Sequence, residues 1–117
     1  MMIVRKEERP TAVREGMRGG GGSVFFRHLM PPDDLPCKTR LLSELTLKKG
    51  DAVGAHGHEG EVEVFYILSG TATVLDDGEE KTLGAGDVAV TDGNTPHSLA
   101  NNHDEDLKVL ALIVLDE

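Results

Sequence analysis

The sequence GDAVGAHGHEGEVEVFYILSG, residues 50–70, decides the fold and the site that we expect for this chain. Within it His56 and His58 stand two residues apart, and side chains at that spacing on an extended segment point to the same side. Both imidazoles can therefore reach one ion. Glu63 on the following segment and His97 from a distant strand would complete four protein ligands, a set that suits a divalent metal ion.

The carboxylate of this set can come from either of two glutamates. Glu63 is in phase with Phe65 and Ile67 on a face that is otherwise apolar, so a carboxylate there needs a partner such as a cation. Glu61 shares that phase and is the alternative ligand. Its position so soon after His58 places it in the turn, which favours Glu63.

The composition is that of one acidic globular domain. The chain has 117 residues, enough for one hydrophobic core but not for two domains. Its formal net charge of −9 argues against nucleic acid or an anionic membrane as a partner. A small anionic molecule remains compatible with this charge, because a buried metal ion sets the local electrostatic field.

The sequence carries no feature of an exported or membrane-bound protein. Cys37 is the single cysteine, so the chain forms no internal disulfide and nothing points to an oxidising compartment. The first residues lack the apolar run of a signal peptide, and no segment has the length of a membrane span. We therefore expect a cytoplasmic protein.

Short alternating runs separated by glycines predict an all-β sandwich or barrel. We expect residues 1–22 to form an irregular N-terminal arm, with Gly19–Gly22 as a flexible turn, and residues 23–117 to form a single barrel domain. The expected strands cover residues 23–29, 40–47, 62–68, 71–75, 81–83 and 88–90, a short segment that begins at His97, and residues 107–115.

The last of these strands, residues 107–115, is apolar on both faces. Val109, Ala111 and Ile113 alternate with Leu110 and Leu112, so both sides of the strand need a cover. One cover would be the barrel interior. The other would be a second subunit, which predicts a homodimer.

These residues resemble the cupin superfamily. The first cupin motif, G-x5-H-x-H-x4-E-x6-G, is matched at every specified position by Gly50, His56, His58, Glu63 and Gly70. The second motif, G-x5-P-x-G-x2-H-x3-N, is matched by Gly86, His97 and Asn101. The short stretch between the motifs is similar to that of small single-domain bacterial cupins, and among these the chain looks most like the oxalate-decarboxylase-like members.

The resemblance implies a double-stranded β-helix, or jelly-roll, barrel that holds a metal. The proline and second glycine of the second motif are replaced by Asp92 and Asn94, which leaves the geometry of that loop open. Three imidazoles and a carboxylate suit Mn²⁺, Fe²⁺, Co²⁺, Ni²⁺ or Zn²⁺, and the sequence does not choose among them.

The metal site leads to three hypotheses about function. The first is a metal-dependent enzyme that acts on a small carboxylate such as oxalate, by decarboxylation or by dioxygen-dependent cleavage. The second is a non-catalytic module that binds or senses a small ligand. The third, permitted by the resemblance, is a sugar-phosphate isomerase or epimerase.

Other polar side chains are weaker candidates for the site. Arg40 could bind a substrate carboxylate, although a solvated arginine at a strand end is the alternative interpretation. Tyr66 could contact the substrate, and Tyr66 or Glu44 could act as acid or base if its strand phase faces the cavity. We expect His28 and His103 to be hydrogen-bonded bystanders.

Overall fold

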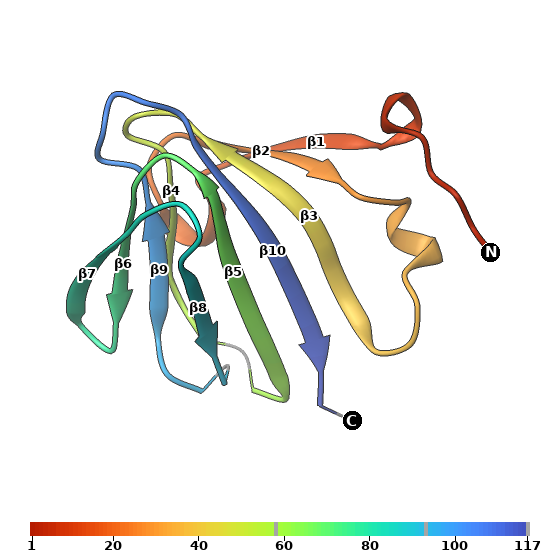
Figure 1. Cartoon of the computed structure of the whole chain (residues 1–117). Coiled ribbons are helices and arrows are strands. Elements are labelled where there is room, and N and C mark those ends of the chain that lie inside the picture. The colour runs from red at the N-terminus through yellow and green to blue at the C-terminus, as the bar shows by residue number, and fades with distance from the viewer. Residues whose placement is uncertain (58, 93, 117) are drawn as a thin grey trace.

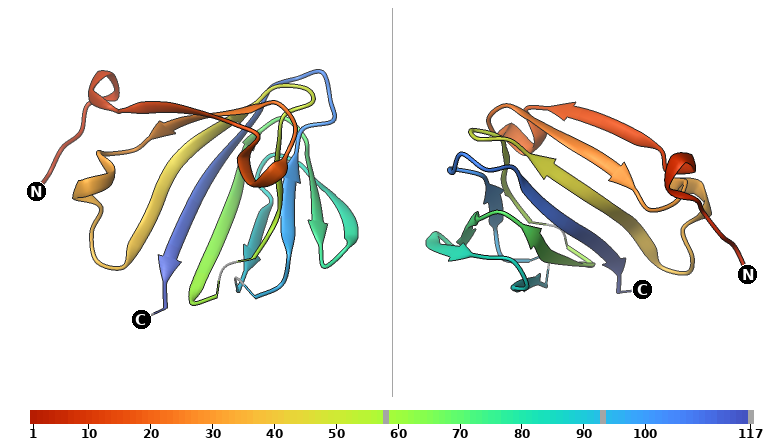
Figure 2. Two further views of the ribbon diagram at one scale, coloured as in Figure 1. Left: turned by 180° about the vertical axis from the view of Figure 1, so that it is seen from behind. Right: turned by 45° about the horizontal axis from the view of Figure 1, so that its top comes forward.

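The computed structural model describes residues 1–57, 59–92 and 94–116, and it contains two antiparallel β-sheets (Figures 1 and 2). The first sheet has the spatial order β1 (Thr11–Glu15), β2 (Ser23–His28), β3 (Thr39–Leu47), β10 (Leu107–Leu115), β5 (Glu61–Ser69) and β8 (Val88–Thr91). The second has the order β4 (Ala52–His56), β9 (His97–Ala100), β6 (Ala72–Asp76) and β7 (Glu79–Leu83). Short 3-10 helices are η1 (Lys6–Glu8), η2 (Met17–Gly19) and η3 (Pro32–Asp34).

This architecture confirms the expected all-β jelly-roll fold. Every stretch that the sequence predicted as a strand forms one, with ends that differ by at most two residues. No helix in the described ranges is long and apolar enough to cross a membrane.

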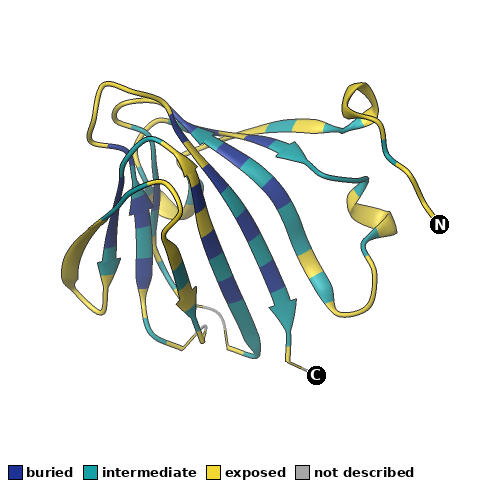
Figure 3. Ribbon diagram, viewed as in Figure 1, coloured by how far each residue is buried: buried dark blue, intermediate teal, exposed yellow. Residues whose placement is uncertain are grey.

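The core lies between the sheets and follows the alternation of the strands, which Figure 3 shows as bands of buried residues. On β3 the buried residues are Ser43, Leu45 and Leu47, and the residues between them are partly exposed. On β5 the same alternation buries Glu63, Phe65 and Ile67. Because the side-chain period of a strand is two, one phase decides which residues enter the core.

The expectation of an irregular arm over residues 1–22 is wrong for part of that segment. Residues 11–15 form β1, which pairs with β2 along its whole length, from Thr11 opposite Arg27 to Glu15 opposite Ser23. Four of the five β1 residues are exposed, so the strand has no apolar alternation that would reveal it. Backbone hydrogen bonds to β2 hold it at the sheet edge instead. The domain boundary at residue 22 stays a prediction.

The glycine run that follows β1 is closed by hydrogen bonds. The Gly16 amide donates to the Gly22 carbonyl at 3.0 Å, and the Ala52 amide donates to the Gly21 carbonyl at 2.9 Å. The loop is thereby attached to β4, the strand that carries His56. Figure 2 shows this loop, with η2, curled against β4.

Candidate metal centre

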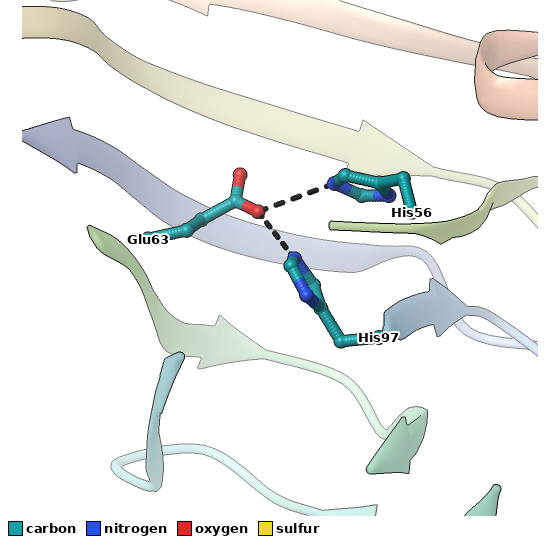
Figure 4. A group of neighbouring side chains, drawn as sticks. All are labelled: His56, Glu63 and His97. Atoms are coloured by element: carbon teal, nitrogen blue, oxygen red, sulfur yellow. Dashed lines mark hydrogen bonds and ion pairs between the residues drawn. The ribbon is translucent and has the colours of Figure 1, made fainter. Parts of the chain in front are cut away.

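Three predicted ligands converge between the two sheets (Figure 4). His56 is the last residue of β4 and His97 the first of β9, and the antiparallel pairing of these strands sets the two residues opposite each other. Glu63 comes from β5 in the other sheet. The alternation that buries Phe65 and Ile67 also turns Glu63 inward, toward both imidazoles.

The three side chains form a compact and buried cluster. Nε2 of His97 lies 2.7 Å from Oε1 of Glu63, and Nε2 of His56 lies 3.4 Å from the same oxygen. The available ligand atoms all lie within 4.8 Å of one another. The side chains of His56 and Glu63 are 7% exposed, and that of His97 is 6% exposed. Side chains this close can share one ion.

Backbone carbonyls orient both imidazoles for metal binding. Nδ1 of His56 donates to the Gly54 carbonyl at 2.7 Å, and Nδ1 of His97 donates to the Thr95 carbonyl at 3.2 Å. A carbonyl only accepts, so the hydrogen sits on each Nδ1 and each Nε2 faces the centre of the cluster. This is the arrangement in which a protein holds a histidine as a ligand through Nε2. The residues present therefore fit a divalent transition metal.

The electrostatics show how the cluster is balanced without a metal. Burial opposes ionisation of Glu63, but hydrogen bonds from His56 and His97 outweigh it and hold the pKa of the carboxyl at about 2. The hydrogen bond to Glu63 raises the pKa of His97, against the opposing effect of burial. A buried carboxylate is thus paired with an imidazole that is ready to carry a proton.

The predictions for the two remaining candidate ligands, His58 and Glu61, have different outcomes. His58 lies outside the described residues, so its role as fourth ligand stays a prediction. Glu61, the alternative carboxylate, forms an ion pair with Nε of Arg40. The structure thus places Glu63, and not Glu61, against the two imidazoles.

Strand phase decides on which side of the sheet the candidate acid or base residues, Glu44 and Tyr66, lie. Glu44 follows the buried Ser43 on β3 and Tyr66 follows the buried Phe65 on β5, so both side chains lie on the outer face of their sheet. Tyr66 is 40% exposed there. Neither residue faces the cavity, so the condition set for an acid or base role is not met. That Tyr66 contacts the substrate stays a prediction, which its outward position does not support.

A cavity of about 570 Å³ adjoins the cluster, with His56 and Glu63 in its wall. Arg40 also lines it, so this arginine stands at the cavity even though it is paired with Glu61. His28, expected to be a bystander, is a wall residue too, and burial followed by the charge of Arg14 lowers its pKa. His103 is exposed in the turn after β9.

Sequence reasoning missed the part of the wall that the N-terminal segment supplies. Arg14, Glu15, Met17 and Arg18 line the cavity although they stand about 40 residues before the motif histidines. The sequence feature that could have pointed to this part of the wall is a pair of arginines, Arg14 and Arg18, beside the glycine run of an acidic chain. The pairing of β1 with β2 and the packing of η2 against β4, both long-range features, bring them to the site.

Comparison with known proteins agrees with this geometry. The Cupin domain family matches residues 43–113. The "Oxalate-binding protein" of Thermotoga maritima is 40% identical over 114 residues, which cover 97% of this chain and 94% of that protein.

Solved structures give the same result. A predicted oxalate decarboxylase from Thermotoga maritima has a TM-score of 0.89 at 40% identity, and the match covers 97% of this chain and 99% of that one. A Cupin 2 conserved barrel domain protein from Salinispora arenicola has a TM-score of 0.67 at 26% identity, over 78% and 75% of the two chains. The chain belongs to the cupin superfamily.

Proposed function

We propose that this cupin binds a divalent transition metal through His56, Glu63 and His97, with His58 as a fourth ligand, and that the metal holds a small carboxylate. The observation that carries the proposal is the convergence of both Nε2 atoms on one buried carboxylate oxygen beside a cavity. The likeness to an oxalate-binding protein over nearly the whole chain supports the choice of ligand.

The donor set defines the chemistry of the site. Imidazole nitrogen with one carboxylate suits Mn²⁺, Fe²⁺, Co²⁺, Ni²⁺ or Zn²⁺ better than Ca²⁺ or Mg²⁺, which take oxygen ligands. The metal would supply Lewis acidity, which stabilises negative charge on a bound carboxylate. The chain itself keeps Nε2 of both histidines directed inward through hydrogen bonds to the carbonyls of Gly54 and Thr95, and it buries both side chains.

The proposal is tested with metal analysis followed by oxalate titration. We expect protein purified without chelator to contain a transition metal, and its calorimetric affinity for oxalate to fall sharply after chelation. His97→Ala should abolish metal retention, whereas His103→Ala should not, because His103 is exposed and outside the cavity. Protein that holds no transition metal, or that binds oxalate equally well after chelation, contradicts the proposal.

The same material decides whether the bound acid is transformed. Loss of oxalate with release of carbon dioxide or formate indicates decarboxylase or dioxygenase chemistry. Saturable binding without product, in the presence of metal and oxygen, indicates a binding or sensing module. The likeness to the Thermotoga maritima oxalate-binding protein favours this second outcome, and the likeness to a predicted oxalate decarboxylase from the same organism favours the first. Sugar phosphates assayed over the same metal series test the isomerase or epimerase alternative.

We also propose a homodimer that buries the outer face of the six-stranded sheet. Strand register aligns apolar and aromatic side chains across that face in two rows, Leu112, Val64 and Val90 in one and Leu110, Tyr66 and Val88 in the other. Val88 is 54% exposed and Val90 is 65% exposed. An apolar area of this kind on one protomer favours pairing with a second copy.

Sedimentation equilibrium tests this assembly. Val90→Lys should shift the protein toward monomer, whereas Ile3→Lys, an exposed apolar position outside the sheets, should not. A wild-type protein that sediments as a monomer at high concentration contradicts the dimer. The cytoplasmic location is a further part of the proposal, and cell fractionation tests it.

A further inference from the structure

The cavity beside the metal centre is large for oxalate. Its volume of about 570 Å³ lies within the range of clefts that enclose ligands of drug size, roughly 300–1,000 Å³. Oxalate consists of two joined carboxylates with no carbon between them. Its oxygens would occupy the metal end and leave most of the cavity unused.

The inner wall of the cavity is built for an apolar group. Phe26, Leu45, Val53, Phe65 and Ile113 all line it, and each is at most 4% exposed. These side chains come from both sheets, so they surround the space on more than one side. Apolar walls offer no hydrogen bond to a carboxylate, and an anion placed against them alone would lose its hydration without compensation.

The N-terminal segment closes the cavity on another side and is held firmly there. Gly20 and Gly54 bring η2 against β4 backbone to backbone, so closely that a Cβ at Gly54 would overlap the carbonyl oxygen of Arg18. Arg18 adopts φ 55°, a left-handed conformation that a non-glycine residue adopts rarely and only where surrounding structure imposes it. Such imposed conformations concentrate at functional sites.

The N-terminal segment brings two guanidinium groups to the cavity of a strongly negative chain. Arg14 and Arg18 line the cavity together with the carboxylate of Glu15, whereas Arg40 is paired with Glu61 and Glu63 lies at the metal end. The Arg14 guanidinium lies 5.5 Å from the centre of the Phe26 ring, which places a cation at the border of the apolar wall. Arginine in this position suits a planar carboxylate.

From these features we infer that the ligand of the site is a dicarboxylate longer than oxalate. One carboxylate lies at the metal centre, an apolar spacer of several carbons lies against the wall of Leu45, Val53 and Phe65, and the second carboxylate lies at Arg14 and Arg18. This inference rests on the proposed function, because it takes the metal centre as the first anchor. It assigns to the N-terminal segment the selection of ligand length.

Calorimetric titration of the metal-loaded full-length protein tests the inference with oxalate, malonate, succinate, glutarate and adipate. We expect the affinity to rise with chain length beyond malonate. We also expect glutarate to bind about tenfold more tightly than pentanoate, which has the same chain but only one carboxylate, because a hydrogen-bonded ion pair contributes on that scale. This comparison uses only the wild-type protein, so it does not depend on a variant that folds.

A variant pair then locates the second anchor. Arg14→Gln should reduce the affinity for glutarate about tenfold and that for pentanoate much less, since only glutarate reaches the guanidinium. Arg5→Gln is the matched control, because it removes the same charge at an exposed residue outside the cavity. If oxalate binds most tightly and longer acids bind progressively worse, this inference is overturned and the proposed function stands. If no acid binds better with metal than without it, both are overturned.

Discussion

The metal-free protein should lose a specific part of its stability in acid, and Glu63 should account for it. A carboxyl whose pKa falls from 4.5 to about 2 on folding contributes about 3 kcal/mol at pH 5.5. The pKa is lowered in the folded state, so the contribution is present above about pH 4.5 and is lost as the pH falls through about 2. At pH 3 about 1 kcal/mol should remain.

Urea unfolding of chelator-treated protein at pH 5.5 and pH 3 measures this change. Other carboxylates titrate over the same range, so the informative quantity is the difference in unfolding free energy between wild type and Glu63→Gln. Glutamine keeps the shape of the side chain and removes its titration. The difference should shrink by about 2 kcal/mol between the two pH values.

Glu80→Gln is the matched control, because it removes one carboxylate from the exposed strand β7. Its difference from wild type should change little over the same pH range. The reasoning is refuted if the effect of Glu63→Gln is equal at pH 5.5 and pH 3. That result would mean that the folded protein does not favour the ionised form of this carboxyl.

Three further outcomes follow from the same contacts. The raised pKa of His97 means that its hydrogen bond to Glu63 stabilises the metal-free fold below about pH 6.5 and is lost as the pH rises through the raised value. Metal binding at pH 6, below the ordinary pKa of an imidazole, should therefore release a proton, seen as a buffer-dependent binding enthalpy, and affinity should fall in acid. His56→Ala should reduce metal affinity by more than about 100-fold in chelator competition, because even residues behind the ligands are worth 10–100-fold. Gly54→Ala should destabilise the fold by about 1–3 kcal/mol in thermal melting, because its Cβ would meet the backbone of Arg18, whereas Gly84→Ala should be tolerated.

The parts of the fold that could be predicted from the sequence are those in which local pattern and burial agree. β3 and β5 each present one buried and one partly exposed face, and period-two alternation reports such faces directly. β1 was missed because nearly all of its residues are exposed, and its pairing with β2 leaves no trace in its own sequence. Edge strands are held by backbone hydrogen bonds, which every sequence can form.

The same distinction applies to the site. His56 and Glu63 were identified because their spacing and phase place them on expected strand faces, and His97 because it matches the second cupin motif. The Arg40–Glu61 ion pair was not, since it depends on which strand ends meet in space. Tyr66 lies one residue out of phase with Phe65 and Ile67, so the alternation of β5 places its side chain on the outer surface and not at the cavity.

The position of Glu63 explains why fold and site depend on each other. Its phase on β5 places a carboxylate in line with core residues, where an unpaired negative charge would be costly. Without metal and below about pH 6.5, the proton on His97 provides the balancing charge, because the hydrogen bond to Glu63 raises the pKa of that imidazole. A divalent ion that binds Nε2 of His97 must displace this proton and take over its role toward Glu63. The protein therefore exchanges one stabilising cation for another at the same atoms, and its metal affinity and its stability must change with pH together.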